Sequence, residues 1–235
     1  NTCDALIIRS RPENGYASVS TVNSDFIQAG GMDISSLPDT ARAFIGLYAP
    51  LDGMNEMGLA VAVNMIEDSD TIDQDTEKPD ITTTTAVRLL LNKAANVDEA
   101  VALLSRYDFH ASMGMMVHLA LADADGNSVV AEYVNNTLVV TDTPVVTNFY
   151  LAPGEKNGIG TVQSHTRFDI LNETLAVQDT MTEADVRDAL DRVSKDNFGE
   201  FESTEWSIVM HQNTKEMIYY HRENYENGYI IAVEE

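Results

Sequence analysis

The pattern of apolar and polar positions divides this chain into many short strands and a smaller number of helices. Short runs that are apolar, or that alternate with polar residues between Gly, Pro, Asn or Asp, are typical of β-strands. The strands predicted in this way cover residues 6–10, 16–22, 44–48, 59–65, 115–122, 128–134, 137–141, 145–149, 205–210, 217–221 and 228–233. Segment 59–65 is almost wholly apolar, which predicts a strand buried on both faces.

Other segments repeat their apolar residues at helical spacing, and several begin with residues that cap helices. The helices predicted in this way cover residues 82–92, 98–106, 167–177 and 184–193. Strands and helices alternate in blocks, and most strands are joined by hairpins, which is typical of antiparallel sheets with segregated helices, an α+β fold. No internal repeat or low-complexity linker interrupts the chain, so we expect residues 1–235 to form a single domain.

Polar segments mark the turns between these elements. Asn14-Gly15 between two predicted strands is a strong hairpin signal. Residues 123–127 also predict a hairpin turn rather than a calcium loop. In a calcium loop the glycine would stand at the sixth position, whereas Gly126 is at the fourth, and Val134 stands where a bidentate Glu is needed. Residues 50–58 predict a turn-rich loop, and the acidic, apolar-poor segment 67–80 predicts an exposed loop that could act as a lid.

Composition excludes some classes of function. The formal charge of -24 would repel phosphate backbones, so we expect no nucleic-acid partner. No apolar run approaches the ~18 residues of a membrane span. The five histidines are too scattered for metal-ligand spacing, and we expect no metal and no cofactor. A single cysteine excludes a disulfide framework and suits a reducing compartment, which favours a cytoplasmic location, although a removed leader would leave no trace here.

The single cysteine, Cys3, is the first candidate for chemistry. It could be a small apolar residue of the first strand, as buried free cysteines often are. It could also be a nucleophile served by its own α-amine, which titrates at roughly 7.7–8.0. The second interpretation requires a free amine, whereas Asn1 and Thr2 precede Cys3 in this sequence.

A series of short motifs follows Cys3. They read Val22-Asn23-Ser24-Asp25-Phe26, Asp52-Gly53-Met54-Asn55-Glu56-Met57-Gly58-Leu59-Ala60-Val61, Asn64, Val146-Thr147-Asn148-Phe149, Ser164-His165-Thr166-Arg167-Phe168 and Thr204-Glu205-Trp206-Ser207. In this order they resemble the choloylglycine hydrolase group of N-terminal-nucleophile hydrolases. That group includes bile salt hydrolases, penicillin V acylases, acid ceramidase-like amidases and acyl-coenzyme A:6-aminopenicillanate acyltransferases. The resemblance covers essentially the whole chain, and segment 52–61 is its most specific part.

The resemblance implies a four-layer αββα sandwich of two antiparallel sheets flanked by helices, and chemistry at linear amide C–N bonds. It implies that Cys3 is the nucleophile, freed by removal of an initiator Met or by autoproteolytic cleavage of a longer propeptide, and that Asp25 holds its amine and thiol. Asn64 and Asn148 would serve the oxyanion hole and the amine, since a neutral amide donates without quenching a thiolate. Arg167 would support the ionised thiol.

The chain departs from the family pattern at Val22, where members commonly carry arginine and the acyltransferase-like branch carries glutamine. Because Val22 cannot donate a hydrogen bond, charge near the thiol would depend more on Arg167. The side chains expected to bind substrate are Phe26, Met54, Met65 and Phe149. The two methionines could instead be plain core positions, since methionine adapts to both roles.

The polar candidates also have structural interpretations. Asp25 could be a turn carboxylate, and Arg167 could belong to an ion pair at a helix start. Asn64 and Asn148 could be strand-end asparagines that bond to the backbone, although Asn64 is unusual within an apolar run.

Taken jointly, the residues predict a cysteine-dependent hydrolase that cleaves a small-molecule acyl amide through an acyl-thioester. We expect it to work as a homo-oligomer. One alternative is an acyltransferase that passes the acyl group to a second amine. The other is a non-catalytic small-molecule-binding protein that retains the fold.

Overall fold

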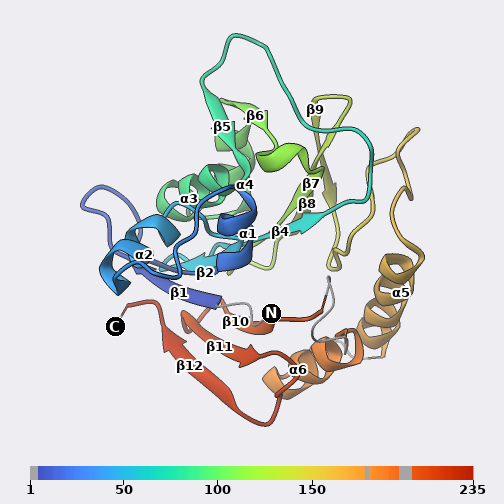
Figure 1. Ribbon diagram of the computed structural model, residues 1–235. Helices are drawn as coiled ribbons and strands as arrows, with labels where there is room; N and C mark the ends of the chain where they lie inside the picture. Colours follow the sequence, from blue (N-terminus) through green and yellow to red (C-terminus); the bar gives the residue numbers. More distant parts are fainter. Residues whose placement is uncertain (1–4, 178–179, 196–202, 235) are drawn as a thin grey trace.

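The computed structural model describes residues 5–177, 180–195 and 203–234, so Cys3 lies outside the described residues. Its largest unit is a seven-stranded antiparallel sheet in the order β1-β2-β3-β4-β7-β8-β9 (Figure 1). These strands are β1 (Ala5–Ser10), β2 (Ser18–Asn23), β3 (Asp52–Asn55), β4 (Ala60–Met65), β7 (Val117–Ala122), β8 (Ser128–Val134) and β9 (Thr137–Asp142). The predicted hairpins β1–β2, β7–β8 and β8–β9 are confirmed by their antiparallel pairing.

A second, three-stranded antiparallel sheet packs on one face of the first. It consists of β10 (Trp206–His211), β11 (Glu216–His221) and β12 (Gly228–Ala232). The two sheets share an apolar cluster in which Val19 of β2 and Met54 of β3 meet Met217 and Tyr219 of β11. A separate parallel pair is formed by β5 (Asp80–Thr82) and β6 (Asp108–His110), which the sequence pattern did not predict.

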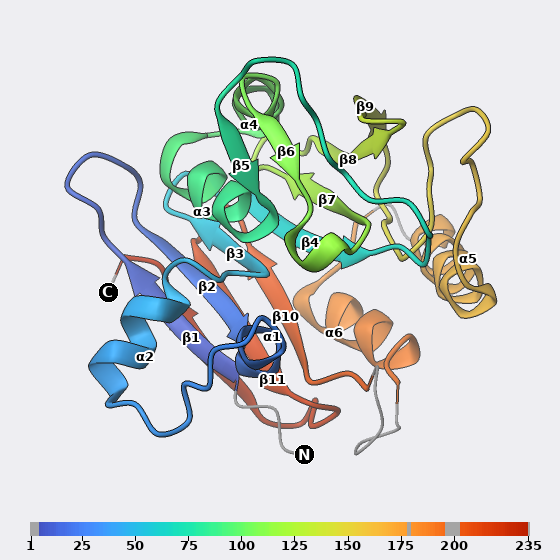
Figure 2. The same cartoon turned by 45° about the horizontal axis from the view of Figure 1, so that its top comes forward.

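Helices cover the outer faces of both sheets (Figure 2). Helices α3 (Thr83–Lys93) and α4 (Val97–Leu104) bury Leu90, Leu91 and Leu104 against the larger sheet in the main core cluster. On the smaller sheet, Val186 and Leu190 of α6 (Glu183–Arg192) pack against the face that points away from the larger sheet. The remaining helices are α1 (Ser24–Ala29), α2 (Asp39–Gly46), the 3-10 turn Ser112–Gly114 and α5 (Val162–Ala176).

The sequence pattern located most helices well. Reciprocal hydrogen bonds between Thr82 and Thr85 cap α3, and Thr182 and Asp185 cap α6 in the same way, as Thr/Ser-based capping boxes do. Helix α5 begins five residues before the predicted start at Arg167, because Thr161 caps it. Within the described ranges, no helix is both long and apolar enough to cross a membrane.

The strand predicted over residues 44–48 is wrong. These residues end helix α2 and form the turn after it, where the backbone N–H groups of Leu47 and Tyr48 donate to the carbonyls of Ala43 and Ile45. Their apolar pattern does not reflect burial, since Phe44 is 67% exposed. Segment 145–149 is also not a strand, because it forms only an isolated bridge, between Phe149 and Gly160.

Residues 50–58, predicted as a loop, contain strand β3, which pairs with both β2 and β4. Gly53 permits this close pairing, because a Cβ atom there would lie 2.4 Å from the carbonyl oxygen of Val19. Strand β4 was predicted correctly but is only half-buried along most of its length, so burial on both faces was overestimated.

Asn55 holds the turn between β3 and β4 through four hydrogen bonds to backbone groups. Its buried Nδ2 donates to the carbonyl oxygens of Leu91 and Ala94, at 3.0 and 2.8 Å. Its Oδ1 accepts from the backbone N–H groups of Met57 and Leu59, at 3.1 and 3.0 Å. The most family-specific stretch of the sequence, residues 52–61, therefore ties the larger sheet to the end of α3.

Candidate active site

Strand order brings several of the predicted site residues to one end of the larger sheet. Strands β2 and β4 both run antiparallel to β3, which lies between them. They therefore end at the same edge of the sheet, which is an edge formed by strand ends and not by an outer strand. Asp25 follows the end of β2, and Asn64 is the penultimate residue of β4. Ala5, which begins β1, pairs with Asn23 at the end of β2. The beginning of β1, Asp25 and Asn64 therefore lie at the same edge.

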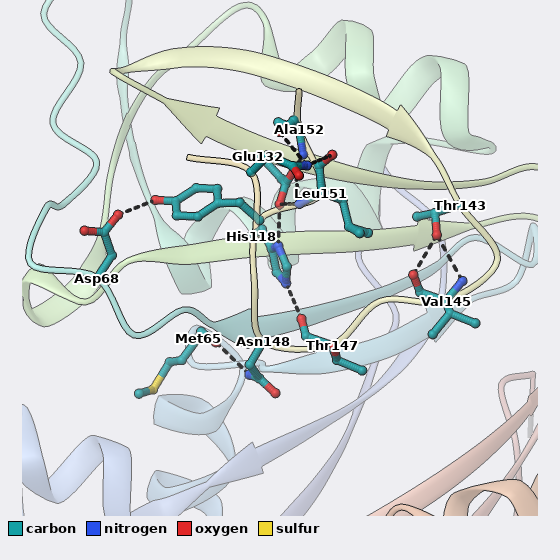
Figure 3. Close-up of polar contacts among 12 residues, drawn as sticks. Met65, Asp68, His118, Glu132, Thr143, Val145, Thr147, Asn148, Leu151 and Ala152 are labelled. Carbon is teal, nitrogen blue, oxygen red and sulfur yellow. Dashed lines mark hydrogen bonds and ion pairs between the residues drawn. The ribbon is translucent and has the colours of Figure 1, made fainter. Parts of the chain in front are cut away.

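Asn148 reaches this edge from the segment after β9, and its amide is held on both sides. Its Nδ2 donates to the carbonyl oxygen of Met65 at 2.6 Å (Figure 3), and its Oδ1 accepts from Nη2 of Arg167 at 2.8 Å. A carbonyl only accepts and a guanidinium only donates, so these contacts determine the orientation of the amide. Among the described residues nothing accepts the second hydrogen of Nδ2.

Arg167 is placed by the start of helix α5. Thr161 caps that helix by accepting from the backbone N–H of Ser164, and Nη2 of Arg167 also contacts the Ser164 hydroxyl, at 3.3 Å. The half-buried guanidinium thereby points at the Asn148 amide. Arg167 and Asn148 were both predicted from the sequence as site residues, and the structure brings them into direct contact.

Asn64 lies beside this contact, since the carbonyl of the next residue, Met65, binds Asn148. Val63 and Met65 pack against the core under α3 and α4, so the alternation of β4 turns Asn64 towards the opposite face of the sheet. The Asn64 side chain is half-buried and has no hydrogen-bond partner in the described part of the chain. A half-buried amide without a partner can donate to a bound ligand.

Asp25 occupies the first turn of the short helix α1. Asn23 caps this helix by accepting from the backbone N–H of Asp25, at 2.8 Å. The Asp25 side chain is exposed, and no hydrogen bond joins it to Asn64, Asn148 or Arg167. The structure thus brings Asp25 to the same edge as Asn64 without connecting it to the other candidates.

The residues expected to bind substrate fall into different environments. Phe149 is 6% exposed and stacks on His165, with 4.0 Å between ring centroids. Met65 and Phe26 are half-buried. Met54 is fully buried in the cluster between the sheets, which is the plain core position that its sequence also allowed.

Two buried residues of this region were not identified from the sequence. The side chains of His118 on β7 and Glu132 on β8 are wholly buried, and Nδ1 of His118 lies 3.0 Å from Oε1 of Glu132 (Figure 3). In the sheet, His118 pairs with Asn64 of β4. A signal was present, since each is the one charged or titratable residue within an otherwise apolar strand run, as Asn64 is the one amide in its own.

His118 and Glu132 bind the backbone on both sides of Asn148. Nε2 of His118 lies 2.7 Å from the Thr147 carbonyl oxygen, while Glu132 accepts from the N–H groups of Leu151 and Ala152, the latter at 2.6 Å. Side chains thus satisfy backbone groups that a neighbouring strand would otherwise bind.

A further polar contact, at Asp52, links the larger sheet to the smaller one. Asp52 on β3 accepts from the Thr21 hydroxyl and, at 2.9 Å, from Nε1 of Trp206 on β10. Burial raises the pKa of Asp52 to about 6, and the hydrogen bonds from Thr21 and Trp206 only partly oppose this rise.

The described residues offer no metal site and one notable cavity. Within 5–177, 180–195 and 203–234, no three His, Cys, Asp or Glu side chains are grouped to hold a metal ion. A cavity of about 260 Å³ lies between the 67–80 loop and the turn after β8, lined by Tyr133, Tyr150 and Lys156 among others. None of the residues predicted from the sequence to form the site lines this cavity.

Comparisons with known proteins agree with this architecture. The family model described as acyl-coenzyme A:6-aminopenicillanic acid acyl-transferase matches residues 43–225. Penicillin V acylase from Agrobacterium tumefaciens is similar in structure, with a TM-score of 0.64 and 20% identity over 94% of this chain and 75% of that one. A mutant of conjugated bile acid hydrolase from Clostridium perfringens has a TM-score of 0.70 and 17% identity, over 97% of this chain and 84% of that one.

A second variant of the same bile acid hydrolase gives a TM-score of 0.66 at 15% identity, over 97% of this chain and 83% of that one. Among curated proteins, no sequence matches this chain. At these levels of identity the structural similarities establish the fold, which is a mixed α+β fold with antiparallel sheets.

Proposed function

Since the chain belongs to the acyl-coenzyme A:6-aminopenicillanic acid acyl-transferase family, we propose that it breaks linear amide bonds through an acyl-thioester on Cys3. The observation that carries this proposal is the arrangement of two asparagines at one edge of the sheet. Asn148 is fixed by Met65 and Arg167 with one N–H to spare, and the neighbouring Asn64 amide is unpartnered in the described part. Two such donors suit an oxyanion that forms between them.

We further propose that the chain is one domain with the four-layer αββα arrangement of N-terminal-nucleophile hydrolases. Support comes from the packing contacts. Helices α3 and α4 lie against the larger sheet, the two sheets share an apolar cluster, and α6 lies against the outer face of the smaller sheet.

In the proposed reaction, the free α-amine of Cys3 takes the proton from its own thiol. The sulfur then attacks the amide carbonyl carbon, and the carbonyl π electrons move to oxygen, where Asn64 and Asn148 donate to the oxyanion. Collapse of this intermediate breaks the C–N bond, and the α-ammonium gives its proton to the departing amine. Cys3 lies two residues before Ala5 in the sequence, and Ala5 is at the edge that carries the asparagines.

The second half of the reaction resolves the thioester. Water attacks the acyl carbon, the α-amine accepts a proton from the water, and the C–S bond breaks to release a carboxylic acid and the thiol. Asp25 would stabilise the α-ammonium form, since an exposed carboxylate near an amine favours its protonation. Phe26, Met65 and Phe149 would lie along the acyl group, whereas fully buried Met54 is left out of this proposal.

An acyltransferase is the second candidate, because the matching family model is named for that activity. The same thioester is then attacked by a second amine, and a new amide is released in place of the acid. Hydrolysis and transfer share every step up to the thioester, so only the accepting nucleophile differs.

The test is a screen followed by product analysis. Protein that begins at Cys3 and protein that retains Asn1 and Thr2 would each be confirmed by intact mass. Both would be incubated with penicillin V, glyco- and tauro-conjugated bile acids, N-acyl amino acids and acyl-homoserine lactones. We expect turnover only in the form that begins at Cys3, with an acyl adduct on Cys3 visible by mass under rapid quench.

The variant Cys3→Ala should bind substrate but release no product. Turnover in Cys3→Ala, or equal activity while Asn1 and Thr2 remain attached, would refute the mechanism. Binding without turnover by every processed form would favour the non-catalytic binding protein. Added amine acceptors would separate the two enzymes, since an acyltransferase forms the new amide in proportion to the acceptor.

A further inference from the structure

The buried side chains of His118 and Glu132 lie against the segment that carries Asn148 (Figure 3). His118 contacts the carbonyl oxygen of Thr147, the residue before Asn148, and Glu132 accepts from N–H groups three and four residues after it. We infer that the His118–Glu132 pair is a positioning device that holds Asn148 in place to bind the oxyanion. This inference rests on the role proposed above for Asn148.

The hydrogen-bond partners determine how many protons the pair carries. Nε2 of His118 faces the Thr147 carbonyl oxygen, which only accepts, so Nε2 carries a hydrogen. Nδ1 faces Oε1 of Glu132, and the carboxyl group already accepts from Leu151 and Ala152. A second proton must lie between Nδ1 and Oε1. The pair therefore holds two protons and is electrically neutral, which makes its complete burial tolerable.

Helix α5 also holds the two neighbours of Asn148, since the Thr147 hydroxyl donates to the Ser164 carbonyl oxygen at 3.0 Å and the Phe149 ring stacks on His165, but neither contact replaces a neighbouring strand. Residues 145–149 pair with no strand, apart from the bridge at Phe149. The Asn148 side chain contacts Met65 and Arg167, but those contacts form only if the backbone presents the amide at the right place. Catalytic groups must be held to within about 0.5 Å, and neighbouring buried hydrogen bonds usually supply that precision.

The same hairpin offers a matched control at its other end. Asp123, which follows β7, is also a buried carboxylate that accepts backbone N–H groups, from Val97, Asp125 and Asn127. The bonds from Asp125 and Asn127 close the β7–β8 turn, the bond from Val97 joins the turn to the start of α4, and none of them touches the Asn148 segment. Loss of the Asp123 bonds should lower stability without affecting catalysis.

The test compares variants that keep or remove the hydrogen bonds. Glu132→Gln can donate to Nδ1 of a neutral His118 while its oxygen still accepts from Leu151 and Ala152, so kcat should stay within about threefold of wild type. Glu132→Met retains the volume but no acceptor. His118→Asn can still donate to Glu132 but is too short to reach Thr147, and it offers a second disruptive variant that leaves the carboxylate partnered.

We expect Glu132→Met and His118→Asn to lower kcat about 10–100-fold, as loss of supporting hydrogen bonds typically does, with KM changed by less than about threefold. Combined with Asn148→Ala, either variant should cause no further loss of kcat, because both act through the same side chain. Asp123→Asn should leave kcat unchanged both in the wild-type protein and in the Asn148→Ala variant. All assays would be run well below each variant's melting temperature.

Hydrogen–deuterium exchange of peptides covering residues 145–152 gives a readout independent of turnover. Exchange there should rise in Glu132→Met and His118→Asn, but not in Glu132→Gln or Asp123→Asn. Unchanged exchange, or an equal further loss of kcat in the Asn148→Ala background, would overturn the inference. Raised exchange in a protein that turns over no acyl amide would instead refute the proposed function while leaving the pair as the anchor of the segment.

Discussion

Two loops of this protein each contain an asparagine whose amide is fixed by hydrogen bonds, and the two amides differ in how many of their hydrogen-bonding groups are occupied. In the turn between β3 and β4, the buried amide of Asn55 makes hydrogen bonds with four backbone groups and has no hydrogen left to donate. In segment 145–152, the half-buried amide of Asn148 makes one donated and one accepted bond and, among the described residues, retains a free N–H. A saturated amide stabilises the fold, whereas an oriented amide with a spare donor can serve a ligand.

The loops also differ in what supports them. The turn at residues 52–59 is held by its own asparagine and by the end of the adjacent helix α3. Segment 145–152 is held by side chains from β7, β8 and α5, which are contributed by distant parts of the sequence. In the first arrangement one buried side chain makes all four hydrogen bonds, whereas the second combines side chains from three different elements.

The largest effect should come from Asn148. Replacing Asn148 by Ala removes one oxyanion donor, which typically costs about 10²–10³ in kcat, with little change in KM. Thermal unfolding should change little, since the amide is only half-buried. Steady-state kinetics on the amide identified in the screen would check this, and a kcat within a few-fold of wild type would place the oxyanion elsewhere.

Asn55→Ala should show the opposite behaviour. Its loss leaves several buried backbone groups unpaired, which should lower the free energy of unfolding by about 2–4 kcal/mol. The kcat measured on the folded fraction should remain that of wild type. Urea denaturation followed by kinetics in the absence of denaturant would test both points, and a large fall in kcat with unchanged stability would reverse the comparison.

Asp123→Asn extends the comparison to a second turn that one buried side chain holds through backbone N–H groups. Burial alone would raise the pKa of Asp123, but the hydrogen bonds from Val97, Asn127 and Asp125 outweigh it and hold the pKa below its usual value of 3.8. The ionised side chain therefore contributes stability that is fully present above that usual value and is lost as the pH falls through the lowered pKa. We expect the variant to be about 1–3 kcal/mol less stable at pH 7.

That difference between wild type and Asp123→Asn should shrink as the pH falls from about 4 through the lowered pKa of Asp123, because the carboxyl group is then protonated and carries no charge. Melting temperatures measured across this range would follow the change. A difference that is the same at every pH would mean that the charge of Asp123 contributes nothing.

The smallest effect, and one of opposite sign, is expected at Asp52. Because burial raises its pKa from 3.8 to about 6, the carboxylate costs stability above that range and not below it. Asp52→Asn can still accept from Trp206 and can donate to the Thr21 hydroxyl. The variant should therefore be more stable than wild type at pH 8, by of order 1 kcal/mol, and similar at pH 4. Lower stability at pH 8 would show that the charge itself is needed between the sheets.

Much of the fold could be predicted from the sequence because its determinants are local. Asn14-Gly15 and the residues around Gly126 form the expected hairpin turns, and Thr82 and Thr182 cap the expected helices. These signals act within a few residues, so the sequence alone specifies them. The order of strands and helices then predicts antiparallel sheets with separate helices.

Errors arose where local signals conflicted with distant partners. The turn residues of 52–55 concealed β3, whose pairing depends on β2 and β4 on either side. The apolar run at 44–48 suggested a strand, although Phe44 is exposed on a helix. In both cases the residue types were compatible with either structure, and packing decided between them.

For the site, the motifs of the sequence and the family that they resemble predicted Asn64 and Asn148 for the oxyanion hole and the amine, and Arg167 as support for the ionised thiol; these roles stay predictions. Only the tertiary structure decided that Arg167 binds Asn148, that Met54 belongs to the core, and that His118 and Glu132 hold the segment between them. These contacts join residues that are distant in the sequence, and no local pattern encodes them. They form only once the sheet has assembled, because burial makes an unpaired polar group costly and so selects the one arrangement in which each group has its partner.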